Sequence, residues 1–89
     1  MYCLIPKKLI KEKGIKPNAK LLYAVIAQQA VDMRCQRNNK WFANVFNVEK
    51  ETISRWLTQL VNYGYIKREI ISYINEKNKN IIKRTLIIN

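Results

Sequence analysis

Apolar residues recur every three or four positions in the first half of the chain. They fall at Ala19, Leu22, Tyr23, Ile26, Ala30 and Met33. This is the spacing of one face of an amphipathic helix. The pattern predicts a long helix that begins near Asn18, a good N-terminal cap, and ends at about Arg34, with its apolar face in the core.

The segment before this helix is short and interrupted. Residues 2–5 are apolar and are followed by Pro6, which predicts an edge strand or an extended arm. Residues 7–13 predict one or two helical turns that stop at Gly14. We therefore treat residues 1–17 as an N-terminal arm or a short strand and helix.

Residues 39–64 predict two helices joined by a tight turn, after a polar connection at residues 35–39. The first helix covers residues 39–46, and Asn47 interrupts the apolar pattern. The second opens near Val48 and Glu49, and Gly64 closes it at a position that favours a left-handed residue.

The rest of the chain predicts a β-hairpin. Residues 65–74 and 81–88 are rich in Ile and Tyr and flank a polar turn at residues 75–80. Even spacing predicts that one face of each strand meets the core. The residues expected on that face are Ile66, Ile70, Ile74, Ile82, Leu86 and Ile88.

Residues 39–64 also satisfy the packing rules of a helix-turn-helix unit. Ala43 is small where the second helix passes over the first, Asn47 tolerates a left-handed turn, and Ile53 anchors the second helix. The other core positions, Phe42, Phe46, Val48 and Trp56, are apolar. With the hairpin, this predicts an α+β, mostly α fold: a winged helix-turn-helix of three helices plus a C-terminal β-hairpin wing at residues 65–89. Two generic amphipathic helices are the alternative interpretation of the same residues.

The charge of the chain favours a polyanionic partner. With 17 Lys and Arg against 6 Asp and Glu, the chain carries a formal net charge of +11. Its length of 89 residues predicts a single domain. Lys, Ile and Asn have A/T-rich codons, so drift in an AT-rich genome is another source of this charge.

Several absences narrow the function. The sequence has no His, and Cys3 and Cys35 have no CxxC partner. It has no glycine-rich phosphate loop. We expect no enzyme, no cofactor, no metal and no small-molecule ligand. No apolar run approaches the roughly 18–20 residues of a membrane span and no signal peptide is evident, so we expect a cytoplasmic protein that does not bind membranes.

The outward face of the second helix carries hydrogen-bonding side chains suited to base edges and phosphates. These residues are Lys50, Glu51, Thr52, Ser54, Arg55, Thr58 and Gln59. Arg55 is the best candidate for reading guanine, because its fork bonds two acceptors. Simple solvation of this face is the alternative, and Glu51 also suits the helix dipole.

Phosphate contacts are expected around this helix. They are assigned to Arg37, Asn39 and Lys40 at the start of the first helix, and to Lys77, Lys79, Lys83 and Arg84 on the wing. Trp41 is either a core residue or a support for a sugar-phosphate contact. A second basic group, Lys7, Lys8, Lys11 and Lys13, either follows the DNA backbone or is a solvated face.

Five segments carry a resemblance to a known family. They are PNAKLLY (17–23), NKWFANVFNV (39–48), TISRWL (52–57), LVNYGYIK (60–67) and KRTLII (83–88). They resemble the winged helix-turn-helix domains of plasmid and phage replication initiators, of the RepA_N, DnaD-like and replisome-organiser kinds. The resemblance implies double-stranded DNA binding at a replication origin. Such initiators usually carry further domains.

Two other functions remain open. A phage or plasmid transcriptional regulator would use the same fold and contacts. The Tyr and Ile content of the hairpin instead favours a protein-interaction or self-assembly module. Helix-turn-helix proteins often bind repeats or palindromes as dimers, which leaves a homodimer on DNA open.

Overall fold

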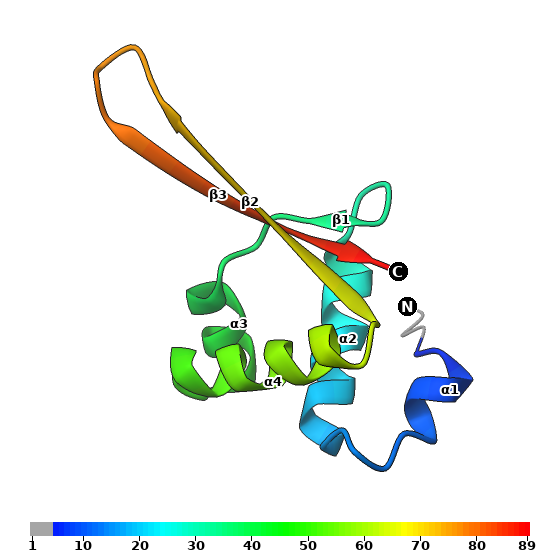
Figure 1. Cartoon of the computed structure of the whole chain (residues 1–89). Helices are drawn as coiled ribbons and strands as arrows, with labels where there is room; N and C mark the ends of the chain where they lie inside the picture. Colours follow the sequence, from blue (N-terminus) through cyan, green and yellow to red (C-terminus); the bar gives the residue numbers. More distant parts are fainter. Residues whose placement is uncertain (1–4) are drawn as a thin grey trace.

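The computed structural model describes residues 5–89 (Figure 1). Its elements, in chain order, are α1 (Lys7–Ile10), α2 (Pro17–Gln29), β1 (Arg34–Cys35), α3 (Asn39–Phe46), α4 (Lys50–Asn62), β2 (Ile66–Ile74) and β3 (Asn80–Ile88). This is an α+β arrangement of four helices and one three-stranded antiparallel sheet within the described residues. Most of the strand or arm predicted at residues 2–5 lies outside them. None of these helices has the length and apolar run needed to cross a membrane.

Helix α2 is shorter than the sequence predicts. It begins at Pro17, with Lys16 as the extended residue before it, and ends at Gln29, so the predicted end at Arg34 is wrong. Asp32 and Met33 have φ angles of 52° and 65°. They form the two-residue turn of a small hairpin in which the N–H groups of Val31 and Arg34 each donate to the other's carbonyl, at 2.8 and 3.0 Å. The helical pattern is broken because this turn redirects the chain into β1.

The two helices at residues 39–62 follow the prediction closely. Helix α3 has the predicted bounds, and Asn38 caps it by accepting a hydrogen bond from the Trp41 N–H at 2.8 Å. Asn47 is left-handed, with φ 55° and ψ 49°. Gly64 is also left-handed, with φ 80°, just beyond the end of α4. The predicted stops of α3 and α4 are therefore confirmed, whereas α1 ends at Ile10, before the predicted stop at Gly14.

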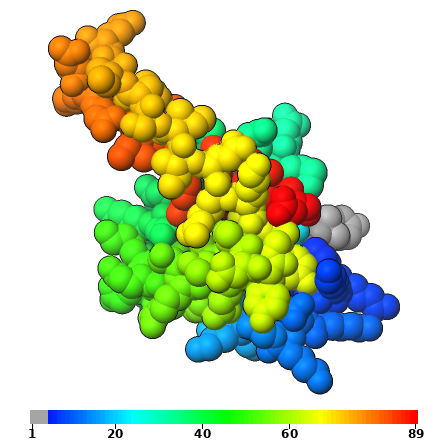
Figure 2. All heavy atoms as spheres, viewed as in Figure 1, coloured from blue at the N-terminus to red at the C-terminus, as the bar shows by residue number. Residues whose placement is uncertain are grey.

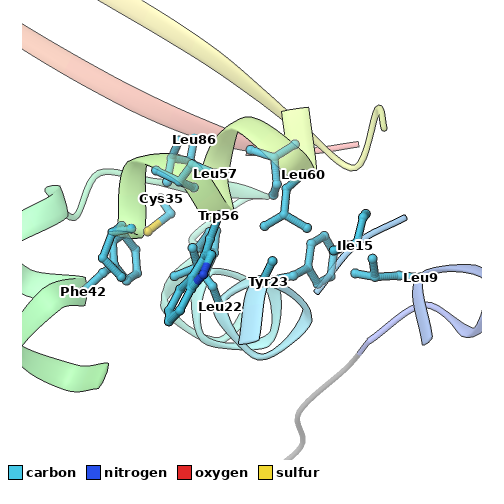
Figure 3. Close-up of a cluster of buried hydrophobic side chains, with 14 of the residues drawn as sticks. Leu9, Ile15, Leu22, Tyr23, Cys35, Phe42, Trp56, Leu57, Leu60 and Leu86 are labelled. Atoms are coloured by element: carbon cyan, nitrogen blue, oxygen red, sulfur yellow. The ribbon is translucent and has the colours of Figure 1, made fainter. Parts of the chain in front are cut away.

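The hydrophobic core lies between α2, α4 and the base of the sheet (Figure 3). Helix α3 contributes Phe42 and Ala43, and α4 contributes Ile53 and Leu57, all buried. The rings of Phe46 and Trp56 meet edge to face, with centroids 5.5 Å apart, and join α3 to α4. The remaining buried residues around them are Leu9, Ile15, Ala19, Leu22, Tyr23, Ile26, Cys35, Leu60, Ile66 and Leu86.

The sheet has the order β1-β3-β2, with antiparallel neighbours. The hairpin is confirmed, with Ile66 opposite Ile88 at its base and Ile74 opposite Asn80 near its tip. Strand β1, which the sequence pattern did not predict, adds Cys35 opposite Leu86. Only the base of the hairpin packs on the helices.

The outer half of the hairpin projects from the body of the molecule (Figures 1 and 2). The molecule measures 47 Å along its longest axis and 27 Å along the others. Ile70, Ile74 and Ile82 are exposed, so the prediction that they meet the core is wrong. Even spacing places them on the core-facing side of the sheet, but the strands extend beyond the helices that could cover them.

Candidate nucleic-acid interface

Helix α4 presents a polar face to solvent, opposite the buried Ile53, Trp56 and Leu57. Among the predicted site residues of this helix, Lys50, Glu51, Ser54 and Arg55 are exposed, and Thr52, Thr58 and Gln59 are half-buried. A face of this kind offers several donors and acceptors to one ligand surface.

Some of these side chains already have partners. An Arg55 Nη2 donates to Thr52 Oγ1 at 3.4 Å, which lies at the limit of hydrogen bonding. Thr58 Oγ1 donates to the Ser54 carbonyl of its own helix at 2.9 Å. Gln59 Oε1 accepts from the Lys16 backbone N–H at 3.1 Å, just before α2 begins. Gln59 thus links α4 to the start of α2, whereas the contact of Arg55 is too long to fix its side chain.

The start of α3 is tied to β3 by Arg84. This guanidinium donates to Asn39 Oδ1 and, at 2.8 Å, to the Arg37 carbonyl. Burial lowers the pKa of Arg84, the Cys35 thiol opposes this effect, and the positive charge of Arg68 adds to it. Arginine nevertheless stays protonated in proteins. Arg84 is therefore a positively charged side chain that links the wing to the start of α3.

The segment before α3 holds a second arginine in a defined position. The Arg37 guanidinium lies over the Trp41 ring, 4.7 Å from its centroid, and its Nε donates to Gln29 Oε1 at 3.4 Å. Trp41 is half-buried and packs against the core, so it serves both the core and the arginine. Lys40 is exposed beside them.

A groove runs between this segment and the wing. It has a volume of about 400 Å³. Its lining residues are Gln36, Arg37, Asn38, Asn39, Ile82, Lys83 and Arg84. An adjoining hollow of about 610 Å³ shares Gln36 and Arg37 and adds Arg34 and Asp32. Positive side chains outnumber the single acid here, so the groove suits an anionic ligand.

The wing tip carries free lysines on a well-formed turn. Asn75 Oδ1 accepts from the backbone N–H groups of Lys77 and Lys79 at 2.9 and 3.0 Å, which shapes the turn. Both lysine side chains are exposed. Lys83 is exposed as well, with its ammonium 6.0 Å from the centroid of the Tyr73 ring.

Within residues 5–89, one acidic side chain forms ion pairs with the cations. Glu69 lies 3.7 Å from Arg34 and 3.9 Å from Lys67. These are the ion pairs found in that range, and both are exposed, so each contributes little. The predicted cationic residues of α3, α4 and the wing tip are outside them.

The N-terminal basic group lies elsewhere. Lys7, Lys8, Lys11 and Lys13 are exposed on and after α1. Helix α1 lies at the opposite end of the molecule from the wing tip (Figure 1). One end of the molecule therefore carries the wing and the groove, and the other carries this group.

Sequence reasoning missed Gln36 as a lining residue of the basic hollow, which Arg34 lines as well. They line it because β1 and the turn before it bring them beside α3. Asp32 and Met33 form this turn, but only Asp is a residue type that is typical of a left-handed turn, so the sequence carried a weak signal for it.

No protein-family model matches the chain, and no curated protein matches it either. Within residues 5–89, no group of three or more Cys, Asp or Glu side chains is placed to hold a metal ion.

Proposed function

We propose that this chain is a winged helix-turn-helix protein that binds double-stranded DNA in a sequence-specific manner. The observation that carries the proposal is the joint placement of a polar α4 face, a basic groove at the start of α3 and a projecting hairpin with a basic tip. In helix-turn-helix proteins the second helix enters the major groove and its exposed side chains meet base edges.

Each part has a role in this proposal. Arg55 reads a base edge, with Lys50, Ser54 and Thr52 contacting bases or the backbone beside it. Arg37 and Lys40 bind phosphates at the start of α3, and Arg84 holds the wing against that site. Lys77 and Lys79 contact phosphates or the minor groove from the wing tip.

We propose further that the bound DNA is a plasmid or phage replication origin. This part rests on the sequence resemblance to replication initiators. A transcriptional regulator of a phage or plasmid operon is the second candidate, because the same contacts would serve an operator. Selecting fragments of the source replicon that the protein retains, and mapping them, separates the two: origin repeats support the first and promoter sequences the second.

The test of α4 is the substitution of Arg55. If Arg55 bonds guanine with both arms of its fork, Arg55→Ala weakens cognate binding by about 1–3 kcal/mol and relaxes specificity at one base pair. Fluorescence anisotropy with the selected duplex and a single-base variant measures both effects at fixed salt.

Arg55→Lys is the matched control, since it keeps the charge and loses the fork. Base reading predicts that Arg55→Lys loses specificity almost as fully as Arg55→Ala. If Arg55→Lys restores wild-type discrimination, Arg55 contacts phosphate. If Arg55→Ala leaves cognate affinity unchanged, α4 is not the reading helix.

A further inference from the structure

The outer half of the wing exposes large apolar side chains on both faces. The exposed fractions are 68% for Ile70, 56% for Ile71, 43% for Tyr73, 70% for Ile74 and 67% for Ile82. A two-stranded hairpin with nothing packed on it is marginally stable in water. Apolar clusters of this kind on a soluble surface mark interaction sites.

The outer half of β2 also lacks the usual protection of a sheet edge, although Lys67, Arg68 and Glu69 lie nearer the base of the strand. The sheet order leaves β2 unpaired along its outer side. Edge strands are usually protected from pairing by charges or proline, yet residues 70–74 read IISYI and contain neither. On the other side of the hairpin, β3 carries Lys83 and Arg84, which protect that edge.

The backbone of β2 has groups free to pair outward. At the tip, the Asn75 N–H donates to the Lys79 carbonyl at 3.0 Å. At the base, the Asn89 N–H donates to the Tyr65 carbonyl at 3.2 Å. Because bonded residues alternate along an antiparallel ladder, the odd-numbered positions of β2 bond to β3. The even-numbered positions in residues 66–74 then direct their N–H and C=O groups to the open edge.

We propose that this edge pairs with the same edge of a second copy of the chain, in an antiparallel register centred on Ser72. In that register Ser72 faces Ser72, Ile70 faces Ile74, and Ile71 faces Tyr73. Apolar and β-branched or aromatic pairs of this kind stabilise neighbouring strands. The segment is therefore complementary to itself, which favours a second copy over a foreign strand.

Charges at the ends of this pairing act in opposite directions, one attractive and one repulsive. Arg68 reaches the end of the second copy's strand, beside its Glu76, while Lys67 lies on the other face toward its Lys77. The apolar pairs in the middle therefore decide the register. Because both copies use one edge, the contact closes at a dimer and does not continue into a fibre.

The response to salt separates this proposal from DNA binding. Each copy carries a net charge of +11, so two copies repel and added salt strengthens their association by screening. DNA binding weakens with salt because counterions are released. The dimer does not depend on the proposed DNA function, and either can fail while the other holds.

Sedimentation equilibrium of the chain without DNA tests the dimer. We expect the average mass to rise with concentration from 10.6 kDa toward twice that value, and more readily at high salt. Ser72→Pro removes an outward N–H from β2 and should abolish the dimer. Ile82→Pro is the control at the same rung, since it removes an outward N–H from β3, and should leave the dimer intact.

Cysteine trapping tests the register, including the case in which a proline disturbs the hairpin. Facing residues of paired strands lie within disulfide range. In a Cys3→Ser background, where Cys35 is buried, Ser72→Cys should form a covalent dimer under mild oxidation and Ile82→Cys should not. A monomer up to millimolar concentration, equal trapping at both positions, or loss of the dimer only in Ile82→Pro would overturn the proposal.

Discussion

At the residue scale, the two glycines occupy backbone positions with opposite requirements. A Cβ on Gly14 would overlap the Tyr63 hydroxyl oxygen, whereas one on Gly64 would meet nothing within 4 Å. Gly64 has φ 80°, which strains any residue with a side chain. Gly14 is thus constrained by a neighbour, and Gly64 by its own conformation.

This difference predicts that the effect of Gly14→Ala on folding stability changes sign when the Tyr63 side chain is removed. Gly14→Ala destabilises the wild type by up to about 1 kcal/mol, because the exposed Tyr63 ring must move. In a Tyr63→Ala background the same change stabilises by about 0.4–1 kcal/mol, since alanine restricts the unfolded chain. Gly64→Ala costs about 1 kcal/mol in either background. Urea unfolding midpoints measure all of these; an equal effect of Gly14→Ala in both backgrounds would contradict the packing argument.

At the element scale, what the sequence predicted depended on local signals. The bounds of α3 and the left-handed stops at Asn47 and Gly64 were predictable because caps and turns act over a few residues. The early end of α2 was not, since Ala30 and Met33 continue the helical spacing. The exposure of Ile70 was also beyond reach: periodicity gives the face of a strand but not the length of the helices beneath it.

The candidate site likewise contains residues that local patterns predict and contacts that they do not. The exposed cations Lys50, Arg55 and Lys40 were placed by helical spacing. The partners of Gln59 and Arg84 depend on residues more than 40 positions away, and no local pattern contains that information. A polar side chain on a predicted binding face can therefore serve the fold.

Two neighbouring cations on β3, Lys83 and Arg84, allow a role in DNA binding to be separated from a role in the fold. Arg84→Ala leaves the Arg37 carbonyl and Asn39 Oδ1 without their donor and should cost about 1–2 kcal/mol of folding stability. Lys83→Ala removes the same charge from an exposed position and should change stability by less than about 0.5 kcal/mol. Its effect should appear in DNA affinity. Denaturant unfolding measures the stability of both variants and anisotropy measures their DNA affinity. Equal losses of stability would show that Arg84 does not link the wing to α3.

At the scale of the whole molecule, the positive charge is spread over both ends of an elongated shape. The proposed interface uses the end with the wing and the groove, and α1 lies at the other end (Figure 1). A net charge alone attracts DNA from any direction. Position must therefore decide which lysines contact phosphates.

Two double substitutions with equal loss of charge distinguish position from net charge. Lys77→Gln with Lys79→Gln removes two phosphate contacts at the wing tip, so the slope of log affinity against log salt should become shallower by about 1.8, since each contact contributes about 0.9. Lys7→Gln with Lys8→Gln should leave the slope nearly unchanged. Anisotropy titrations across a salt series give both slopes. If the two pairs lower the slope equally, the cations act only through net charge, and the wing does not touch DNA.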